Sequence, residues 1–525
     1  MPTISLQEQA RPEIDELEVK ARVREILNRH PAVGLAVGVV HDGSLRFFSG
    51  HGLADIASNT PVTQDTVFRI ASITKTFTAI AVMQLWERGL VDLDAPANDY
   101  LRAYRLVPAK AGFRPATVRH LLTHTAGIAE QVPSWGVLMP DYGESLKVGR
   151  PLPTLARYYR GALRIHAEPG TRFAYGDHGP ATLGQLVQDV SGKPLDRYLR
   201  EHVFEPLGMA NTDLVRSDRV RPHLATGYKL SAGGPRAVTD REAVPAGAVS
   251  VYSTTNDMAR YTAALLGGGS GQHGQVLKPE TLATMFQPHY QPDLRMPGMG
   301  LGFFRGDTGG HLLVEHGGIM PGFNSQLLVA PDDGVGVLAF TNGASRAVMW
   351  LPAEMEKLLN WLLGVPDQAI RTGVAHHPEI WGDLCGWYHL PGRFTDVRAR
   401  SMLGAGVEVF VRRGQLMLRG LTPLPALYRG FALHPDDDKD PCVFRMDLAE
   451  VGSARVVFSR QLGAGTTAVH LEFLFFPISL WKRPNVQNPR RWVNGALAAA
   501  ATAVAVRHGR RASRAHRPRD ASVHG

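Results

Sequence analysis

Cysteine is almost absent from this chain: of 525 residues, only Cys385 and Cys442 are cysteines. Two thiols exclude a disulfide framework and a zinc site built from four thiolates, and they do not fix a redox compartment. Long apolar runs are also scarce. The one stretch of interest, Trp492–Val506, holds 15 residues, mostly alanine, whereas a membrane-spanning helix needs roughly 20.

A secretion leader is a further absence. The chain starts MPTISLQEQARPEIDELEVKARVREIL, in which no basic segment is followed by an apolar run. Because a leader of the Sec type needs both parts, we expect the protein to reside in the cytoplasm.

Most of the chain carries no net charge. The formal charge is +9, and residues 482–525 account for it, with ten Lys or Arg against the single acid Asp520. A neutral body excludes a nucleic-acid footprint, so we expect no nucleic-acid partner. The Ala/Arg-rich tail, residues 485–525, is expected to be disordered or partly helical. The alternative is weak contact with an anionic membrane surface, which attracts basic residues.

What is present is a globular composition, with 44% hydrophobic residues. Apolar residues at helical spacing predict a helix over 13–29. Runs at 32–40 and 44–50 flank Asp42-Gly43, a strong hairpin signal, and a second hairpin is expected over 325–342. Two hairpins at opposite ends of a largely helical region predict one antiparallel sheet flanked by helices. We therefore assign residues 1–365 to one mixed α/β domain.

After Val365-Pro366 the pattern changes to short β-type runs. They lie at 407–412, 415–421, 442–448, 454–459 and 469–476. Such spacing predicts a second, smaller all-β domain over 370–484, built as a sandwich or barrel. The Gly-rich stretch 267–274 lacks the Lys-Ser/Thr pair of a phosphate-binding loop, so it is interpreted as a flexible connection.

The first candidate catalytic residues lie in residues 68–94, FRIASITKTFTAIAVMQLWERGLVDLD. A helix starting near Ala71 places Ser72 in the first turn, where the helix dipole and free N–H groups stabilise an anion. Lys75, three residues on, shares a helix face with Ser72, so its amine can reach the hydroxyl. Burial or a neighbouring cation makes a lysine a proton acceptor. Ser-x-x-Lys alone is weak evidence.

Two further segments support a catalytic role for Ser72 and Lys75. Tyr175 lies in a loop just before an apolar helix, where a phenol can relay a proton. His316-Gly317-Gly318 ends an apolar run; two glycines let a ligand lie against the strand edge, and His316 is placed to donate to a carboxylate or ester oxygen.

These three segments, in this order, resemble the serine β-lactamase and penicillin-binding-protein superfamily, and most of all the branch of class C β-lactamases, D-Ala-D-Ala carboxypeptidases and related esterases. Three more segments are similar to family motifs: HLLTHTAGI (120–128), FEPLGMANT (204–212) and PAGAVSVYSTTNDMARY (245–261). The resemblance implies a transpeptidase-like fold and acylation of Ser72, with Lys75 and Tyr175 sharing general acid–base work. It also implies an oxyanion hole formed by the N–H groups of Ser72 and Ile319. No cofactor or metal is implied.

Two departures from the family pattern bear on the substrate. The second motif usually reads Tyr-x-Asn, but here Asp177 holds the third position, and an ionised carboxylate cannot donate to an acylamino group. The third motif reads Lys-Thr-Gly in class C β-lactamases, whereas this chain has His316-Gly317-Gly318, without a permanent cation. Both departures favour hydrolysis of a small ester over hydrolysis of an antibiotic.

Several alternatives stay open. Either Lys75 or Tyr175 is the base. The substrate is a small ester or a peptide, the second reading being D-Ala-D-Ala carboxypeptidase or weak β-lactamase activity. A catalytically inactive ligand-binding relative is the alternative of another class. His120 and His124 have the spacing of a zinc helix without the Glu of His-Glu-x-x-His, so each is interpreted as a loop or core histidine.

Overall fold

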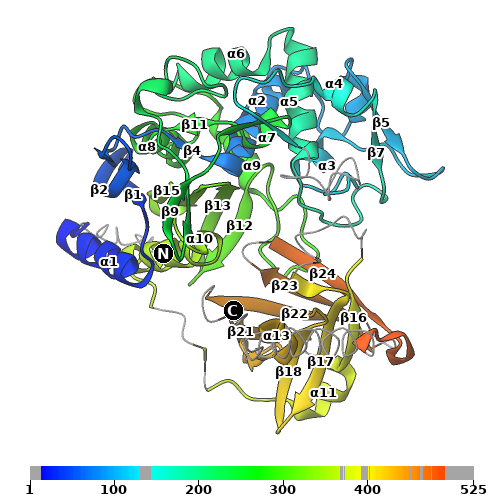
Figure 1. Cartoon of the computed structure of the whole chain (residues 1–525). Helices are drawn as coiled ribbons and strands as arrows, with labels where there is room; N and C mark the ends of the chain where they lie inside the picture. The colour runs from blue at the N-terminus through cyan, green and yellow to red at the C-terminus, as the bar shows by residue number, and fades with distance from the viewer. Residues whose placement is uncertain are drawn as a thin grey trace, which may run out of the picture. The chain divides into compact units, whose positions relative to one another are not determined.

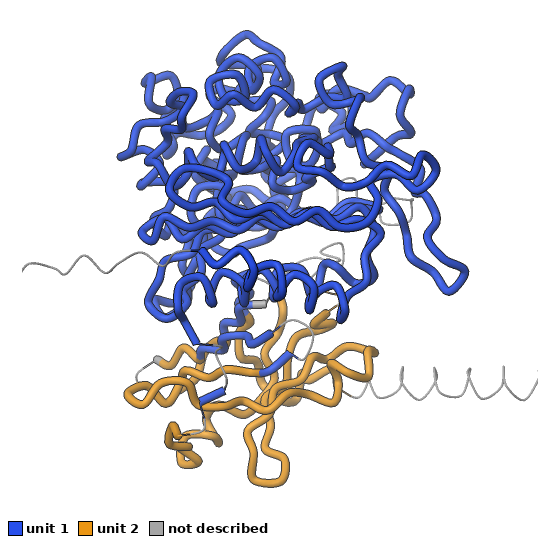
Figure 2. The backbone as a smooth tube through the Cα atoms, turned by 90° about the vertical axis from the view of Figure 1, so that its left-hand side faces the viewer, with its two compact units in different colours: residues 1–371, 447–457, 470–479 blue, residues 372–446, 458–469, 480–525 orange. Residues whose placement is uncertain are grey.

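The computed structural model describes residues 14–130, 144–366, 370–371, 373–391, 400, 402–448, 452–461, 465–473 and 476–490. The chain forms two compact units, each described here by itself (Figure 2). The first comprises residues 1–371, 447–457 and 470–479, and the second comprises residues 372–446, 458–469 and 480–525.

A seven-stranded antiparallel sheet is the frame of the first unit (Figure 1). Its order is β12-β13-β14-β15-β1-β2-β3. The bounds are β1 Gly34–His41, β2 Ser44–Asp55, β3 Thr60–Pro61, β12 Phe304–Thr308, β13 His311–Met320, β14 Phe323–Ala330 and β15 Val335–Thr341. Strand β1 pairs with β2 and, across the chain, with β15. The prediction of one antiparallel sheet assembled from both ends of the region is confirmed.

Alternate residues of β1 serve two separate cores. Side chains on opposite faces of a strand point in opposite directions. Val37 and Val39 accordingly pack with the helices α1 (Glu16–Arg29) and α10 (Ala347–Leu362), while Ala36 and Val40 join the larger core around α2 (Thr74–Glu87) and α8 (Thr255–Leu266). All eight residues of β1 are therefore buried.

Helix α1 confirms the first predicted helix. Asp15 caps it, because its carboxylate accepts from the N–H groups of Leu17 and Glu18 at 2.9 and 3.1 Å. Val23 and Ile26 face the core at 1% and 3% exposure, whereas Leu17 is 80% exposed. The apolar stripe is therefore what attaches this helix to the sheet.

The remaining elements of the first unit are shorter helices and short strand pairs. The helices are α3 Val118–Leu122, α4 Leu155–Tyr158, α5 His178–Ser191, α6 Leu195–Leu199, α7 Ala246–Val249 and α9 Pro279–Phe286. Four short strand pairs accompany them: β4 Phe68–Arg69 with β11 Tyr252–Ser253, β5 Arg105–Pro108 with β7 Ala162–Ile165, β6 Ser145–Lys147 with β10 Arg241–Ala243, and β8 Tyr228–Ser231 with β9 Gly234–Ala237.

A nine-stranded sheet follows in the order β19-β18-β17-β16-β24-β23-β22-β21-β20. The bounds are β16 Gly386–His389, β17 Gly406–Arg412, β18 Gln415–Gly420, β19 Phe431–Ala432, β20 His434–Pro435, β21 Val443–Asp447, β22 Ser453–Gln461, β23 Gly465–Phe473 and β24 Phe476–Arg483; the short helices are α11 Pro378–Leu384 and α13 Pro425–Arg429. The prediction of a second, β-rich domain is confirmed.

One predicted strand was wrong. The run 469–476 is not a single strand, because β23 ends at Phe473 and β24 begins at Phe476. The sequence at this boundary, FLFFP (473–477), is apolar throughout and holds no Gly, Asn or Asp that would mark a turn. The uniform hydrophobicity of this segment therefore gave no signal for the boundary between β23 and β24.

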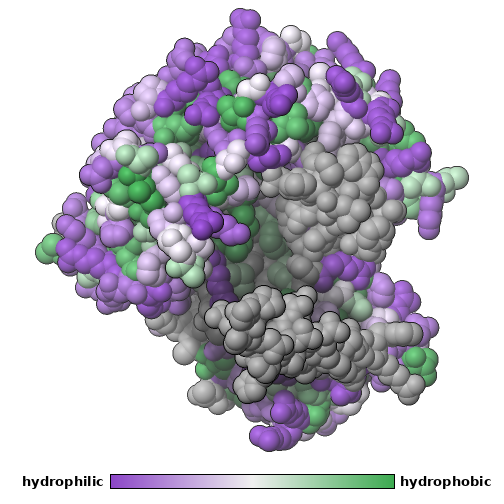
Figure 3. Space-filling view, in the orientation of Figure 1, coloured by the Kyte–Doolittle hydropathy of each residue, from purple (hydrophilic) through white to green (hydrophobic). Residues whose placement is uncertain are grey.

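Within the described ranges, no helix has the length and apolar character required to cross a bilayer. The stretch Trp492–Val506 and most of the basic tail lie outside those ranges. On the face shown in Figure 3, hydrophobic residues are interspersed with hydrophilic ones over the first unit, as is usual for protein surfaces.

Candidate active site

Ser72 lies at the start of α2, as predicted, on a single 3₁₀ turn, Ala71–Ile73, that leads directly into the helix. Ala71 has a φ of 48° and is fully buried. A side chain in this left-handed region costs energy unless the surroundings hold it there, and such residues gather at functional sites. Ser72 is itself 9% exposed.

Lys75 is the centre of a buried polar group. Its ammonium nitrogen Nζ donates to Ser72 Oγ at 2.9 Å, to Asp177 Oδ1 at 2.6 Å and to the carbonyl oxygen of Ala248 at 3.2 Å. An ammonium has three N–H donors, so these contacts use all of them. Lys75 is 3% exposed and Asp177 8%. Lys75 and Asp177 therefore form a desolvated ion pair, and another N–H group of the ammonium donates to Ser72.

The segment 246–251 fixes α2 in this place. Besides the Lys75 contact, Thr78 donates its hydroxyl to the carbonyl oxygen of Gly247 at 2.7 Å. The N–H of Val251 donates to Thr74 Oγ1 at 3.0 Å. Farther along the same motif, Asp257 is fully buried and accepts from the N–H of Asn211 and the hydroxyl of Thr212 at 2.7 and 2.8 Å. Two of the family-like segments thus meet as structural supports of the site.

Asp177 is the N-terminal flanking residue of α5, yet its side chain makes no capping bond to the helix. The carboxylate contacts Lys75 instead. The next residue, His178, is 1% exposed and anchors the loop: its Nδ1 lies 2.9 Å from the hydroxyl of Tyr159, and its Nε2 lies 3.2 Å from Glu144 Oε1. Sequence reasoning did not single out His178; its position directly after the second motif was the available signal.

Tyr175 is half-buried beside the lysine, with Lys75 Nζ 4.9 Å from its ring centroid. On another side the ring of His124 lies 4.6 Å away, centroid to centroid. The N–H of Ala174 donates to the carbonyl oxygen of His124 at 2.9 Å, which ties the tyrosine loop to the segment 120–128. The predicted serine, lysine and tyrosine therefore come together from separate parts of the chain.

Strand β13 forms the opposite wall. Its pairing with β12 runs from Glu315 to His311, so residues 316–320 extend beyond that neighbour. This stretch lies against the serine turn: a Cβ built on Gly318 would overlap the carbonyl oxygen of Ile70 and the hydroxyl of Ser325. Ser325 Oγ also donates to that carbonyl at 2.8 Å. Gly318 is therefore required for the approach of β13 to Ser72.

His316 is 1% exposed and lies close enough to Lys75 to feel its charge. Burial, reinforced by the positive charge of Lys75, lowers its pKa to about 3. The imidazole is therefore neutral at pH 7. Its Nδ1 lies 2.7 Å from the carbonyl oxygen of Gly317, which places the proton on Nδ1 and leaves Nε2 as an acceptor. The donor role expected for His316 thus requires a protonated ring, which burial disfavours.

Gly317 and Ile319 complete the predicted segment. Gly317 pairs with Gln326 and Ile319 with Asn324 on β14. The Ile319 side chain is 57% exposed, so this residue presents an apolar side chain at the open end of the strand. Its oxyanion-hole role stays a prediction.

His120 has a structural role near the site. It belongs to α3, where the N–H of Thr117 donates to His120 Nδ1 at 3.1 Å and the N–H of His120 donates to Thr117 Oγ1 at 3.3 Å. This reciprocal pair satisfies the first N–H groups of the helix.

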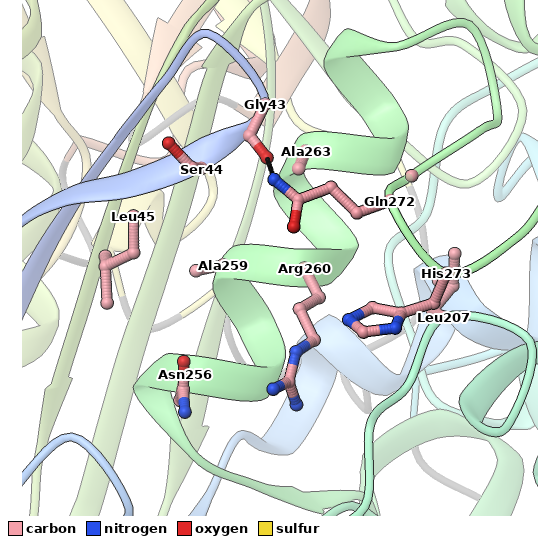
Figure 4. A pocket seen from close by; sticks show the side chains of 11 residues that line it. Gly43, Ser44, Leu45, Leu207, Asn256, Ala259, Arg260, Ala263, Gln272 and His273 are labelled. Carbon is pink, nitrogen blue, oxygen red and sulfur yellow. Dashed lines mark hydrogen bonds between the residues drawn. The ribbon is translucent and has the colours of Figure 1, made fainter.

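A separate pocket of about 270 Å³ lies beside α8 (Figure 4). Arg260 and Asn256 line it from the helix, and Gln272 and His273 line it from the Gly-rich stretch 267–274. That stretch is folded: Gly269 has a φ of 90°, and Ser270 pairs with Gln275. None of the predicted catalytic residues lines this pocket.

Comparisons with known proteins agree with this geometry. The Beta-lactamase family model matches residues 19–357. Penicillin-binding protein 4 of Amycolatopsis lactamdurans is 29% identical over 392 residues, covering 72% of this chain and 98% of that protein. Esterase EstB of Burkholderia gladioli is 27% identical over 308 residues, covering 53% and 76%.

A solved structure extends the likeness in fold. The octameric penicillin-binding protein homologue from Pyrococcus abyssi matches with a TM-score of 0.55 and 23% identity, covering 89% of this chain and all of that one. The resemblance to the penicillin-binding-protein superfamily is confirmed, since the family model spans well over half of the residues: this chain belongs to the Beta-lactamase family.

Proposed function

We propose that this protein is a serine hydrolase that forms an acyl-enzyme on Ser72 and hydrolyses a small ester. The observation that carries the proposal is the contact of 2.9 Å between Lys75 Nζ and Ser72 Oγ, within a buried ion pair to Asp177. The hydroxyl lies at the start of α2, where the helix dipole favours negative charge on oxygen.

Two features favour an ester over a substrate with a free carboxylate or an acylamino group. Asp177 is committed to Lys75, and an ionised carboxylate has no hydrogen to donate to a substrate carbonyl. His316, with its pKa lowered to about 3 by burial, offers no cation to a carboxylate at pH 7. An ester needs neither contact.

The ion pair also bears on which residue is the base. In the ion pair with Asp177, Lys75 is an ammonium, and an ammonium has no lone pair to take the serine proton. We assign the base role to Tyr175, whose ring centroid lies 4.9 Å from Lys75 Nζ. Tyr175 takes the Ser72 proton as Oγ bonds to the carbonyl carbon, and returns it to the departing alcohol. Water then attacks the acyl-enzyme, Tyr175 takes its proton, and Ser72 recovers it as the acid leaves.

Ester turnover and active-site labelling test the proposal. Purified protein should release p-nitrophenol from p-nitrophenyl esters of short acids, and a fluorophosphonate should label the wild type but not Ser72→Ala. Turnover without loss in Ser72→Ala would refute the nucleophile. Absence of both turnover and labelling would favour the catalytically inactive, ligand-binding alternative.

The base assignment has its own test. Tyr175→Phe should lower kcat by at least about 100-fold, as expected for loss of a general base, and should lower it far more than Asp177→Asn. The opposite order would return the base role to Lys75.

A second candidate is D-Ala-D-Ala carboxypeptidase or weak β-lactamase activity. The likeness to penicillin-binding protein 4 over 98% of that protein favours it. Release of D-alanine from a D-Ala-D-Ala peptide at a kcat/KM above that for the esters would make peptidase the main activity; hydrolysis of nitrocefin would do the same for β-lactamase.

A further inference from the structure

Residues 470–479 belong to the same unit as the candidate active site, although the Beta-lactamase match ends at residue 357. Phe476 is the contact residue of this segment. Its ring lies 5.0 Å from that of Tyr175, centroid to centroid, and 5.3 Å from that of Phe304. Tyr175 and Phe304 in turn lie 5.8 Å apart. Three rings therefore meet at the residue that we propose as the base.

A polar chain holds the segment in place. The hydroxyl of Ser479 lies 2.9 Å from His470 Nδ1, across the β23–β24 hairpin. Ser479 and the backbone of Phe173 both hydrogen-bond to the Tyr290 hydroxyl and oppose the rise in its pKa that burial causes. The Tyr290 ring stacks on Phe173, 6.1 Å between centroids. Phe476 is thus fixed by its own strand rather than by its ring contacts alone.

The three rings differ in what they leave accessible. Phe304 is fully buried, whereas Tyr175 and Phe476 are half-buried. Phe476 and Phe304 meet edge to face, with an angle of 88° between ring planes, while Phe476 is tilted 57° to Tyr175. Tilted and edge-to-face arrangements are those in which aromatic rings attract one another, so a further ring can extend the cluster.

The charges nearby do not favour an ionic substrate group. Lys75 is paired with Asp177, and His316, whose ring lies 5.2 Å from that of Phe304, is neutral at pH 7. On the side where Phe476 lies, the rings in contact with Tyr175 are the apolar rings of Phe304 and Phe476.

We propose that Phe476 is a specificity-determining residue, which makes the proposed hydrolase prefer acyl groups that carry an aromatic ring. This inference rests on the proposed esterase function and adds its substrate class. The segment 470–479 supplies one wall of the acyl site, and the aromatic acyl group packs against Phe476 while Ser72 attacks its carbonyl.

The test compares p-nitrophenyl phenylacetate with p-nitrophenyl acetate, which share a leaving group and differ in the acyl ring. Phe476→Ala should lower the ratio of their kcat/KM values about tenfold, as expected for loss of one aromatic pair together with its buried area. Phe476→Leu, which keeps apolar volume without a ring, should lower it about threefold. Trp481→Ala is the matched control, because Trp481 is another aromatic residue of β24 and is 37% exposed. It should leave the ratio unchanged.

Fluorophosphonate labelling of Ser72 distinguishes failure of this inference from failure of the proposed function. If wild type and both Phe476 variants are labelled and hydrolyse p-nitrophenyl acetate, a ratio that changes less than twofold in Phe476→Ala overturns the inference and leaves the proposed function intact. An equal rise in kcat/KM for both esters also overturns it, because Phe476 would then be a cover over the site. If wild type neither turns over nor is labelled, the proposed function fails and this inference fails with it.

Discussion

The burial of His316 predicts a specific dependence of stability on pH. Its pKa is about 3 in the folded chain, against about 6.5 for an unperturbed histidine. Between these values the unfolded chain binds a proton that the folded chain does not, so stability rises with pH. The contribution is complete above the unfolded value and is lost as pH falls from about 6.5 towards 3. With a slope of about 1.36 kcal/mol per pH unit once the unfolded histidine is charged, the loss between pH 7 and pH 5 is about 2 kcal/mol.

His316→Gln removes this titration and keeps a polar side chain. Urea unfolding of the full chain at pH 7 and pH 5 should show that the variant loses about 2 kcal/mol less than wild type over this interval. Contributions of the other histidines cancel in the comparison. His273→Gln, at an exposed site, controls for loss of an imidazole. If wild type and His316→Gln lose the same free energy, the buried neutral state of His316 is refuted.

Two further substitutions test the supports of the site. Gly318→Ala should prevent fluorophosphonate labelling, because the new Cβ would overlap the Ile70 carbonyl oxygen. The control is Gly306→Ala on β12, where a Cβ meets only ordinary contacts at 3.4 Å and beyond, and this variant should be labelled at the wild-type rate. Equal labelling of both variants would contradict the requirement for glycine at position 318. Asp257→Ala should cost about 3 kcal/mol of unfolding free energy in urea, because it leaves buried donors unpaired. Asp218→Ala, at a side chain that is 97% exposed, should change it by less than about 0.5 kcal/mol, and a similar cost for both would argue against the buried network.

The sequence predicted the central sheet because its signals are local. Asp42-Gly43 and Asp333-Gly334 each lie between apolar runs, and both hairpins form there. Ser72 and Lys75 were identified for the same reason: they lie three residues apart, so the local backbone alone brings their side chains together. Tyr175 and Gly318 lie far from them along the chain; each was singled out by its own local sequence, and only the family resemblance predicted that they join Ser72 and Lys75 in one site.

The features that could not be predicted from the sequence depend on packing between distant segments. The neutral state of His316 results from burial next to Lys75, which no local pattern encodes. Phe476 looked like one more apolar residue of a strand, although its ring contacts Tyr175. The left-handed conformation of Ala71 was equally invisible, because alanine carries no preference for it.

The pairing of β1 with β15 has a consequence for how the protein is made. About 290 residues separate the two strands, so at ribosomal rates of about 5–20 residues per second β1 waits roughly 15–60 s for its neighbour. Until then one edge of a strand whose eight residues are all buried in the finished fold stays unpaired. Nascent or truncated chains that stop before Val335 should therefore be prone to aggregate through that edge and should depend on chaperones.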